Sequence, residues 1–277
     1  MLKCYAVPEV SEDCASGPLR ELYEDIKLVL KVPVINSVFR TLACYDRFLF
    51  LAWNQIRPSL LTLNFEEAAE TLRHFNISVV NPITDWHIYY SDIQINIIIN
   101  IIRSFNYANA KLLLMVCAWA ESLSERPIYG AGNNKGRIKP GVIPEFPDIK
   151  LIEFNETPLN IKELYEDIAK TCCEFSIASD FRVLANYPSF LIESWKGLRP
   201  YVNSQEYREL KSGIKSKAVE LIHSMPFAVT IDKEILEKLY TPKDIAAIIG
   251  FISMFQDTLP GLIINGEFFK KIIEKTE

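Results

Sequence analysis

The sequence predicts an all-α protein of two homologous helical repeats packed as an intramolecular pseudo-dimer. Three observations predict this fold class. A long segment occurs twice along the chain, apolar residues recur at helical spacing with no competing strand alternation, and the 277 residues include only ten glycines. With 49% hydrophobic residues, the chain can bury a substantial core.

The repeat is the strongest signal of organisation. The motif ELYEDI occupies 21–26 and recurs at 163–168, an offset of 142 residues. At that offset, positions 21–60 and 163–202 are identical at 18 of 40 places. Such self-similarity is typical of a duplicated structural unit.

The match continues at an offset of 150, where FNYANAKLLL (105–114) aligns with FQDTLPGLII (255–264). We therefore expect a first helical repeat at 1–125 and a second at 159–277. The intervening 126–158 holds four of the ten glycines and five of the fifteen prolines, a composition typical of a linker. Its GAGNNKG lacks the strand and helix that a phosphate-binding loop needs.

The elements of the first repeat follow in order. Gly17 and Pro18 begin an amphipathic helix, and Pro33 ends it. A second helix is predicted at 37–53. The amphipathic stretch NFEEAAETLRHF predicts a third, and the long apolar segments 84–105 and 111–123 are also predicted to be helical.

Charge and hydropathy limit the partners. A net charge of −5 and a pI near 5.5 argue against nucleic acid. The apolar stretch IQINIIINII is interrupted by polar residues and is too short to cross a bilayer. No secretory signal pattern opens the sequence. We expect a cytoplasmic protein with no membrane partner.

The six cysteines form no C-x-x-C pair, and no histidine stands near them at metal-ligand spacing. We expect reduced thiols, no metal and no cofactor. No G-x-S-x-G motif supports an esterase nucleophile.

One difference between the repeats is chemically informative. Residues 34–45, VINSVFRTLACY, align with 176–187, SIASDFRVLANY, and Asp180 stands where the first copy has Val38. A valine there predicts an interior position, so Asp180 would be poorly hydrated. Its pKa would then rise, as suits a general base. The structural alternative is that Ser179 or Asp180 caps a helix.

Shared residues are expected to serve the fold. Arg40 and Arg182 are expected to pair with acids such as Asp25 and Asp167, or to cap carbonyls. Helix starts near Ser37 and Ser179 would offer unpaired N–H groups to a small anion. The interface between the repeats is the expected place for one pocket.

LYEDIKLVLKVPVINSVFR, FLFLAWNQIRP, IASDFR and FNYANAKLLL together resemble the group I 2-haloacid dehalogenases, the DehI family. The resemblance covers nearly the whole chain. It implies an all-helical pseudo-dimer related to the AhpD-like proteins, and hydrolysis of 2-haloalkanoic acids of both chiralities. It also implies water activated by an aspartate, direct attack on C2, inversion and no covalent ester.

The resemblance also assigns site residues. The family's Ala-Ser-Asp matches Ala178, Ser179 and Asp180, with Asp180 as the base. A catalytic asparagine falls at Asn109 or Asn106. Substrate-binding residues are expected in both halves: Val34, Asn36 and Ser37 in the first, where family members carry bulkier aromatic residues, and Phe251, Ile252 and Phe255 in the second.

The expected partner is a small 2-haloacid, and a homodimer stays open. The alternative function is a non-catalytic AhpD-like helical protein that binds a small carboxylate or acts as an interaction scaffold. Hydrolysis of another small acid is a third option.

Overall fold

The computed structural model describes residues 7–77, 85–130, 132–141, 149–172 and 177–274. Within these ranges the helices and 3-10 helices are joined by loops, and the only strands are one small antiparallel pair, β1 (Ile128–Tyr129) with β2 (Ala228–Val229). The predicted all-α fold class is confirmed. The short β1 lies inside the predicted linker, where no strand was expected.

The helix bounds follow the sequence repeat. The first half contains α1 (Gly17–Leu30), α2 (Ser37–Leu42), η1 (Ala43–Tyr45), α3 (Asp46–Leu60), α4 (Leu63–Thr71), η2 (Trp86–Ile88) and α5 (Asp92–Leu123). The second half contains η3 (Phe154–Glu156), α6 (Leu159–Cys172), α7 (Ser179–Leu184), α8 (Pro188–Val202), α9 (Gln205–Ile222), α10 (Lys233–Glu237) and α11 (Pro242–Ile273). Helices α1, α2 and α3 recur 142 residues later as α6, α7 and α8, and α5 recurs 150 residues later as α11.

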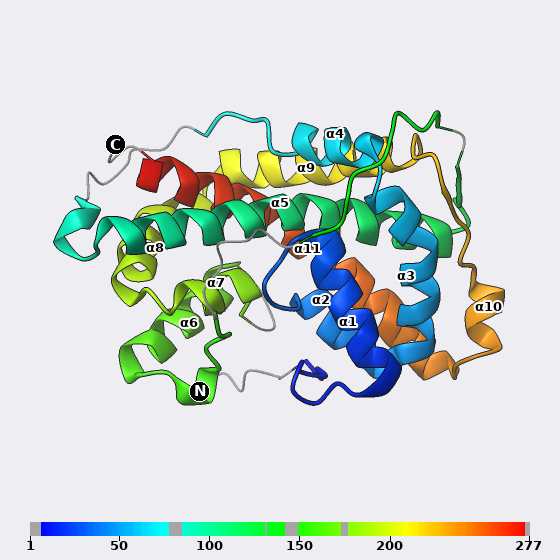
Figure 1. Ribbon diagram of the computed structural model, residues 1–277, viewed down its shortest axis with the longest axis horizontal. Helices are drawn as coiled ribbons and strands as arrows, with labels where there is room; N and C mark the ends of the chain where they lie inside the picture. The colour runs from blue at the N-terminus through cyan, green and yellow to red at the C-terminus, as the bar shows by residue number, and fades with distance from the viewer. Residues whose placement is uncertain (1–6, 78–84, 131, 142–148, 173–176, 275–277) are drawn as a thin grey trace.

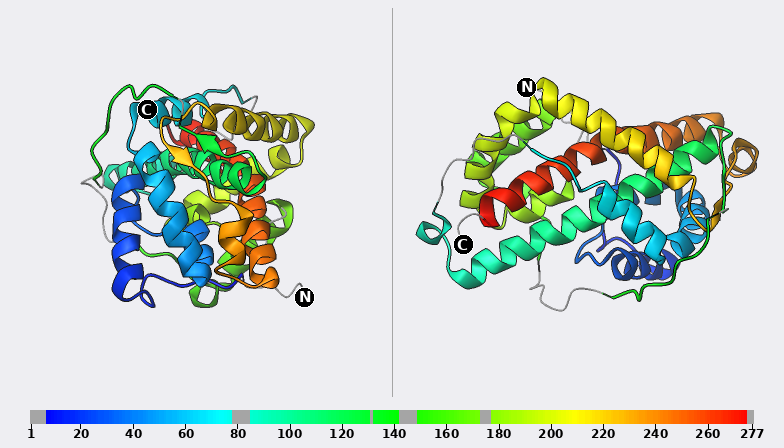
Figure 2. Two further views of the ribbon diagram at one scale, coloured as in Figure 1. Left: turned by 90° about the vertical axis from the view of Figure 1, so that its right-hand side faces the viewer. Right: turned by 90° about the horizontal axis from the view of Figure 1, so that it is seen from above.

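The two longest helices form the centre of the molecule. Helices α5 and α11 run antiparallel and lie side by side (Figures 1 and 2). Gln256 contacts Cys117 in the middle of the pair, and Arg103 bonds to Glu274 near its end. Their pairing buries the apolar segments that the sequence predicted as helical.

Helix α11 is long and apolar enough, by length and composition, to cross a bilayer. In this fold it is a core helix instead. It packs along α5, and 50% of its most apolar 18-residue stretch is buried.

The smaller helices divide between the two ends. In Figure 1, α1–α3 lie below α5 on the right, α6–α8 lie below it on the left, and α4 and α9 lie above. Short helix α7 contacts α5, and its counterpart α2 contacts α11. Each short helix therefore packs against the long helix of the other half.

The predicted single helix at 37–53 is wrong, because the chain breaks it at η1. Tyr45 has φ −125° and ψ 62°, which no α-helix accommodates, and a new helix starts at Asp46. Apolar spacing continues across the break, so periodicity did not show it. In the second half, Asp46 is matched by Pro188, the first residue of α8. Proline is favoured at the first position of a helix.

The expected partners of the repeated arginines also need correction. Asp25 accepts hydrogen bonds from Trp53 Nε1 at 2.7 Å and from Arg57 Nε at 2.6 Å and Nη2 at 2.7 Å. Asp167 makes the matched bonds to Trp195 and Arg199. These carboxylates therefore tie α1 to α3 and α6 to α8.

Arg40 and Arg182 pair with other acids. Both are buried, and Glu9 lies 3.2 Å from Arg40 and 3.9 Å from Arg182. Arg182 also bonds to Glu153. The N-terminal segment thus supplies one carboxylate that links α2 to α7, the two helices that begin at the site described below.

Replacing Asp25 by Asn should lower the free energy of unfolding at pH 7 by about 1.5–3 kcal/mol. Burial raises the pKa of Asp25, but the hydrogen bonds from Arg57 and Trp53 outweigh it and the pKa is lowered. This stabilisation is therefore present at neutral pH and lost as pH falls through the lowered pKa. Urea unfolding from pH 7 down to pH 2 measures it.

Asp167→Asn is the matched control, with a smaller expected loss because Arg199 is more exposed than Arg57, 54% against 37%. Equal stability of wild type and Asp25→Asn at pH 7 would contradict the assignment.

Candidate active site

One pocket lies where α2, α5, α7 and α11 meet; its enclosed part has a volume of about 30 Å³, room for a water or two, and it opens to solvent. The residues that line it are Asn36, Ser37, Val38, Asn109, Leu112, Ala178, Ser179, Asp180, Met254, Phe255, Thr258, Leu259 and Leu262. Most of the lining is apolar, and no lysine, arginine or histidine of the described residues belongs to it.

Matched positions of the two repeats line this same pocket. At the offset of 142 the pairs are Asn36 with Ala178, Ser37 with Ser179, and Val38 with Asp180. At the offset of 150 they are Asn109 with Leu259, and Leu112 with Leu262. The α5–α7 side therefore carries the polar pair Asn109 and Asp180, where the α11–α2 side carries Leu259 and Val38.

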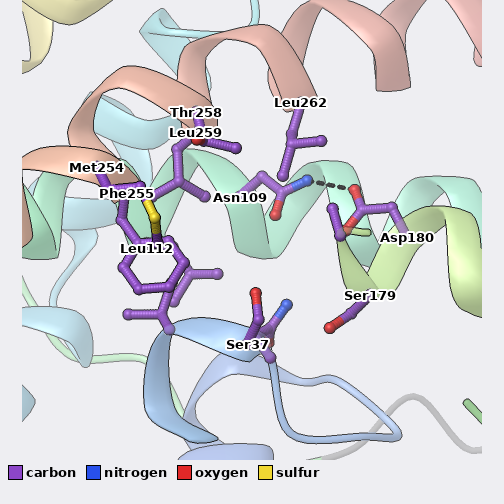
Figure 3. A pocket seen from close by; sticks show the side chains of 13 residues that line it. Ser37, Asn109, Leu112, Ser179, Asp180, Met254, Phe255, Thr258, Leu259 and Leu262 are labelled. Carbon is purple, nitrogen blue, oxygen red and sulfur yellow. Dashed lines mark hydrogen bonds between the residues drawn. The ribbon is translucent and has the colours of Figure 1, made fainter. Parts of the chain in front are cut away.

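The polar pair is directly bonded. Asn109 Nδ2 donates to Asp180 Oδ2 at 2.6 Å (Figure 3). Asn109 is buried in the middle of α5, whereas Asp180 stands in the first turn of α7. The bond therefore joins the central helix of the first half to the short helix of the second.

The environment of Asp180 favours a bound proton. Part of the residue is accessible, yet its carboxylate is enclosed by packed groups, and this burial raises its pKa from 3.8 to about 6. Hydrogen bonds from Asn109 and a backbone N–H lower the pKa, but they offset burial only in part. An acid with this pKa is mostly ionised at neutral pH and can accept a proton there.

Asp180 does not cap its helix. Ala178 is the N-cap of α7 and makes no side-chain capping bond, and the Asp180 carboxylate accepts from the backbone N–H of its own residue. The capping alternative therefore gives no account of the carboxylate, whereas the pocket and the contact with Asn109 do.

Three buried polar atoms of the lining have no hydrogen-bond partner among the described residues: Asn36 Oδ1, Asn109 Oδ1 and Ser179 Oγ. Buried polar groups are normally paired, because an unpaired one loses its hydrogen bonds to water. Their concentration at one pocket indicates a place where a polar ligand or water belongs.

The structure brings most of the expected site residues together and leaves four outside the lining. Asn106 donates to Glu267 on α11 instead of reaching Asp180. Val34 and Ile252 are buried in the core, and Phe251 packs against Tyr45 with ring centroids 6.2 Å apart. In α11 the lining starts at Met254 and runs towards the C-terminus, so the expected stretch began too early.

The α11 residues that sequence reasoning missed had a signal in the repeat. They are Met254, Thr258, Leu259 and Leu262, together with Leu112 on α5. Once Asn109 is taken as a site residue, the offset of 150 selects Leu259 as its counterpart, and the next turn adds Leu112 and Leu262.

Comparison with known proteins adds an independent line. The family model described as halocarboxylic acid dehydrogenase DehI matches residues 33–173. A configuration-inverting 2-haloacid dehalogenase of Alcaligenes xylosoxydans xylosoxydans is 29% identical over 93% of this chain and 90% of its own. An (R)-2-haloacid dehalogenase of Pseudomonas putida is 26% identical over 95% and 91% of the two chains.

The fold has a similar solved structure. A D-2-haloacid dehalogenase mutant in complex with D-2-CPA is 25% identical, with 96% of each chain covered and a TM-score of 0.89.

Replacing Asp180 by Asn should stabilise the folded chain at pH 8, by up to about 3 kcal/mol. An acid with a raised pKa binds its proton more tightly in the folded than in the unfolded state. The stability of the wild type therefore falls as pH rises from 3.8 to about 6, while asparagine cannot ionise.

Urea unfolding of both proteins at pH 4 and pH 8 measures the difference. It should be large at pH 8 and small at pH 4. A variant no more stable than wild type at pH 8 would show that the carboxylate is not held in a dry site.

Proposed function

We propose that this chain, which belongs to the family described as halocarboxylic acid dehydrogenase DehI and is a 2-haloacid dehalogenase, uses Asp180 as its general base. The proposed reaction is the hydrolysis of 2-haloalkanoic acids. One observation carries the proposal: an enclosed aspartate with a raised pKa is bonded to Asn109, whose Oδ1 is left without a partner. Two acceptors then stand side by side for the two hydrogens of one water.

Water activation follows from that arrangement. Asp180 accepts one hydrogen of the water and Asn109 Oδ1 accepts the other, which aims an oxygen lone pair into the pocket. A base with pKa near operating pH combines the ionised state with enough basicity to take a proton. Low hydration around the pair strengthens its electrostatic effect on the water.

In the proposed step the water oxygen forms a bond to C2 while the carbon–halogen bond breaks. Its proton passes to Asp180, the electron pair of the broken bond leaves with the halide, and the product is a 2-hydroxy acid. Asp180 then returns the proton to solvent. Attack opposite the leaving group inverts C2, and no ester to the protein forms.

The two sides of the pocket suit this geometry. In Figure 3, Asp180 and Ser179 lie on one side of Asn109, while Met254, Phe255 and Leu112 lie on the other. A halogen leaving in line with the attack would point towards that apolar wall. Methionine is flexible and polarisable, so Met254 can adapt to halogens of different size.

The substrate carboxylate needs hydrogen-bond donors, since the described lining of the pocket contains no cation. Ser37 and Ser179 supply hydroxyl groups from matched positions, and Ser179 Oγ is buried without a partner. A carboxylate placed between them would face the starts of α2 and α7 and hold C2 towards the water.

Asp180→Asn should abolish halide release from 2-chloropropionate, at least a thousand-fold in kcat, since asparagine cannot take the proton. Chloride release from each enantiomer measures it. Asp257→Asn, at an exposed α11 residue paired with Lys215, is the control and should keep activity.

A single turnover in ¹⁸O-water should label the product and not the protein. Label in the carboxylate of Asp180, or halide release by Asp180→Asn at the wild-type rate, would contradict the proposed step.

The pH dependence of kcat/KM should rise through about 6 and level off above it, because the base works only when ionised. Bound substrate adds a second negative charge beside Asp180 and raises its pKa further, so the kcat profile should turn at a higher pH. Initial rates between pH 4.5 and 9 measure both profiles. Activity that falls across pH 5 to 7 would be incompatible with this base.

A further inference from the structure

Asn36 is a polar residue of the pocket that the proposed reaction leaves without a role. It is 3% exposed, it lines the pocket, and its Oδ1 has no hydrogen-bond partner. Of the other two unpartnered atoms, Asn109 Oδ1 is occupied by the proposed water, and the Ser179 hydroxyl can donate to a carboxylate. Asn36 Oδ1 therefore needs a donor from elsewhere.

The ordinary groups of a 2-haloalkanoic acid cannot supply that donor. A carboxylate and a carbon-bound halogen only accept hydrogen bonds, and an alkyl chain neither donates nor accepts. An amide oxygen only accepts. Binding such a substrate would leave Asn36 Oδ1 buried and unpaired, which is unfavourable.

The fold does not require an amide at this position either. Asn36 is the N-cap of α2, yet its side chain makes no capping bond. The matched N-cap of α7 is Ala178, and the two helices have the same length. A small apolar residue therefore serves the same backbone geometry in the other half.

From this we propose that the pocket selects 2-haloacids whose side chain carries a neutral hydroxyl on C3, with Asn36 as the specificity-determining residue. The inference rests on the proposed function and names its substrate class. The hydroxyl donates to Asn36 Oδ1, which lines the pocket and has no partner among the described residues.

The charge of the pocket lining favours a hydroxyl over a second carboxylate as the substrate group that Asn36 binds. The described lining contains the Asp180 carboxylate and no cation. A dicarboxylate would add a second negative charge from the substrate to a poorly hydrated space, and repulsion would oppose it. A neutral donor satisfies Asn36 without that penalty.

The test compares 2-chloro-3-hydroxypropanoate with 2-chlorobutanoate, which have nearly the same size and differ by a hydroxyl in place of a methyl. Halide release, corrected for the enzyme-free rate, should give a kcat/KM at least ten-fold higher for the hydroxylated acid. Sites built to bond a substrate hydroxyl reject analogues that lack it.

Asn36→Leu, which keeps the side-chain size, should remove the preference by weakening the first substrate and improving the second. Asn96→Leu makes the same change at an exposed position of α5 and should keep the wild-type ratio. Equal kcat/KM values in wild type, or a preference that survives Asn36→Leu, would overturn the inference.

A binding measurement separates this inference from the proposed chemistry. Calorimetry on the wild type compares 3-hydroxypropanoate with butanoate, neither of which carries a halogen. Tighter binding of the hydroxylated acid supports the role of Asn36 even if neither haloacid releases halide, a result that would refute the proposed function alone. Equal binding of the two acids refutes the role of Asn36.

Discussion

The hydrogen bond from Asn109 to Asp180 holds the site together, because it joins a helix of one half to a helix of the other. Helix α5 packs along α11 from about Arg103 onwards, so Asn109 presents its amide from a rigid support. Asp180 comes from the first turn of a six-residue helix, whose position depends on contacts with α5 and on the Glu9–Arg182 pair. The raised pKa of the carboxylate follows from that enclosure. The packing around the carboxylate therefore sets how tightly it holds a proton.

The sequence predicted the helices well where the spacing of apolar residues and the internal repeat determine them. Periodicity identifies which face of a helix is buried, and the repeat transfers each assignment to the other half, so the starts of α1 and α2 were anticipated. The break at Ala43–Tyr45 was not, because apolar spacing runs through it and the turn depends on backbone angles. Pro188 marks the same break in the second half, and a comparison of the two copies at that position would have revealed it.

Most of the site residues expected from the sequence line the candidate pocket, whereas its α11 wall was only partly anticipated. Asp180 emerged because a charge replaces a valine at a matched position, and the structure puts Val38 in the same pocket. The choice between Asn106 and Asn109 needed three-dimensional register, since the two lie almost one helical turn apart and bond to different helices. The α11 wall was placed too early for the same reason: which part of a long helix faces the pocket depends on how it slides against α5.

The meeting of matched positions in one pocket has a consequence for how such an enzyme could arise. Two identical copies of a single repeat would each bring an aspartate to the pocket, at positions 38 and 180. Two carboxylates in one small dry space would share a proton, so the charge would be divided between two acids on opposite sides of the pocket. Fusing the copies into one gene frees the two positions to diverge. One position can then carry the acid while the other carries an apolar side chain, as Asp180 and Val38 do in this pocket.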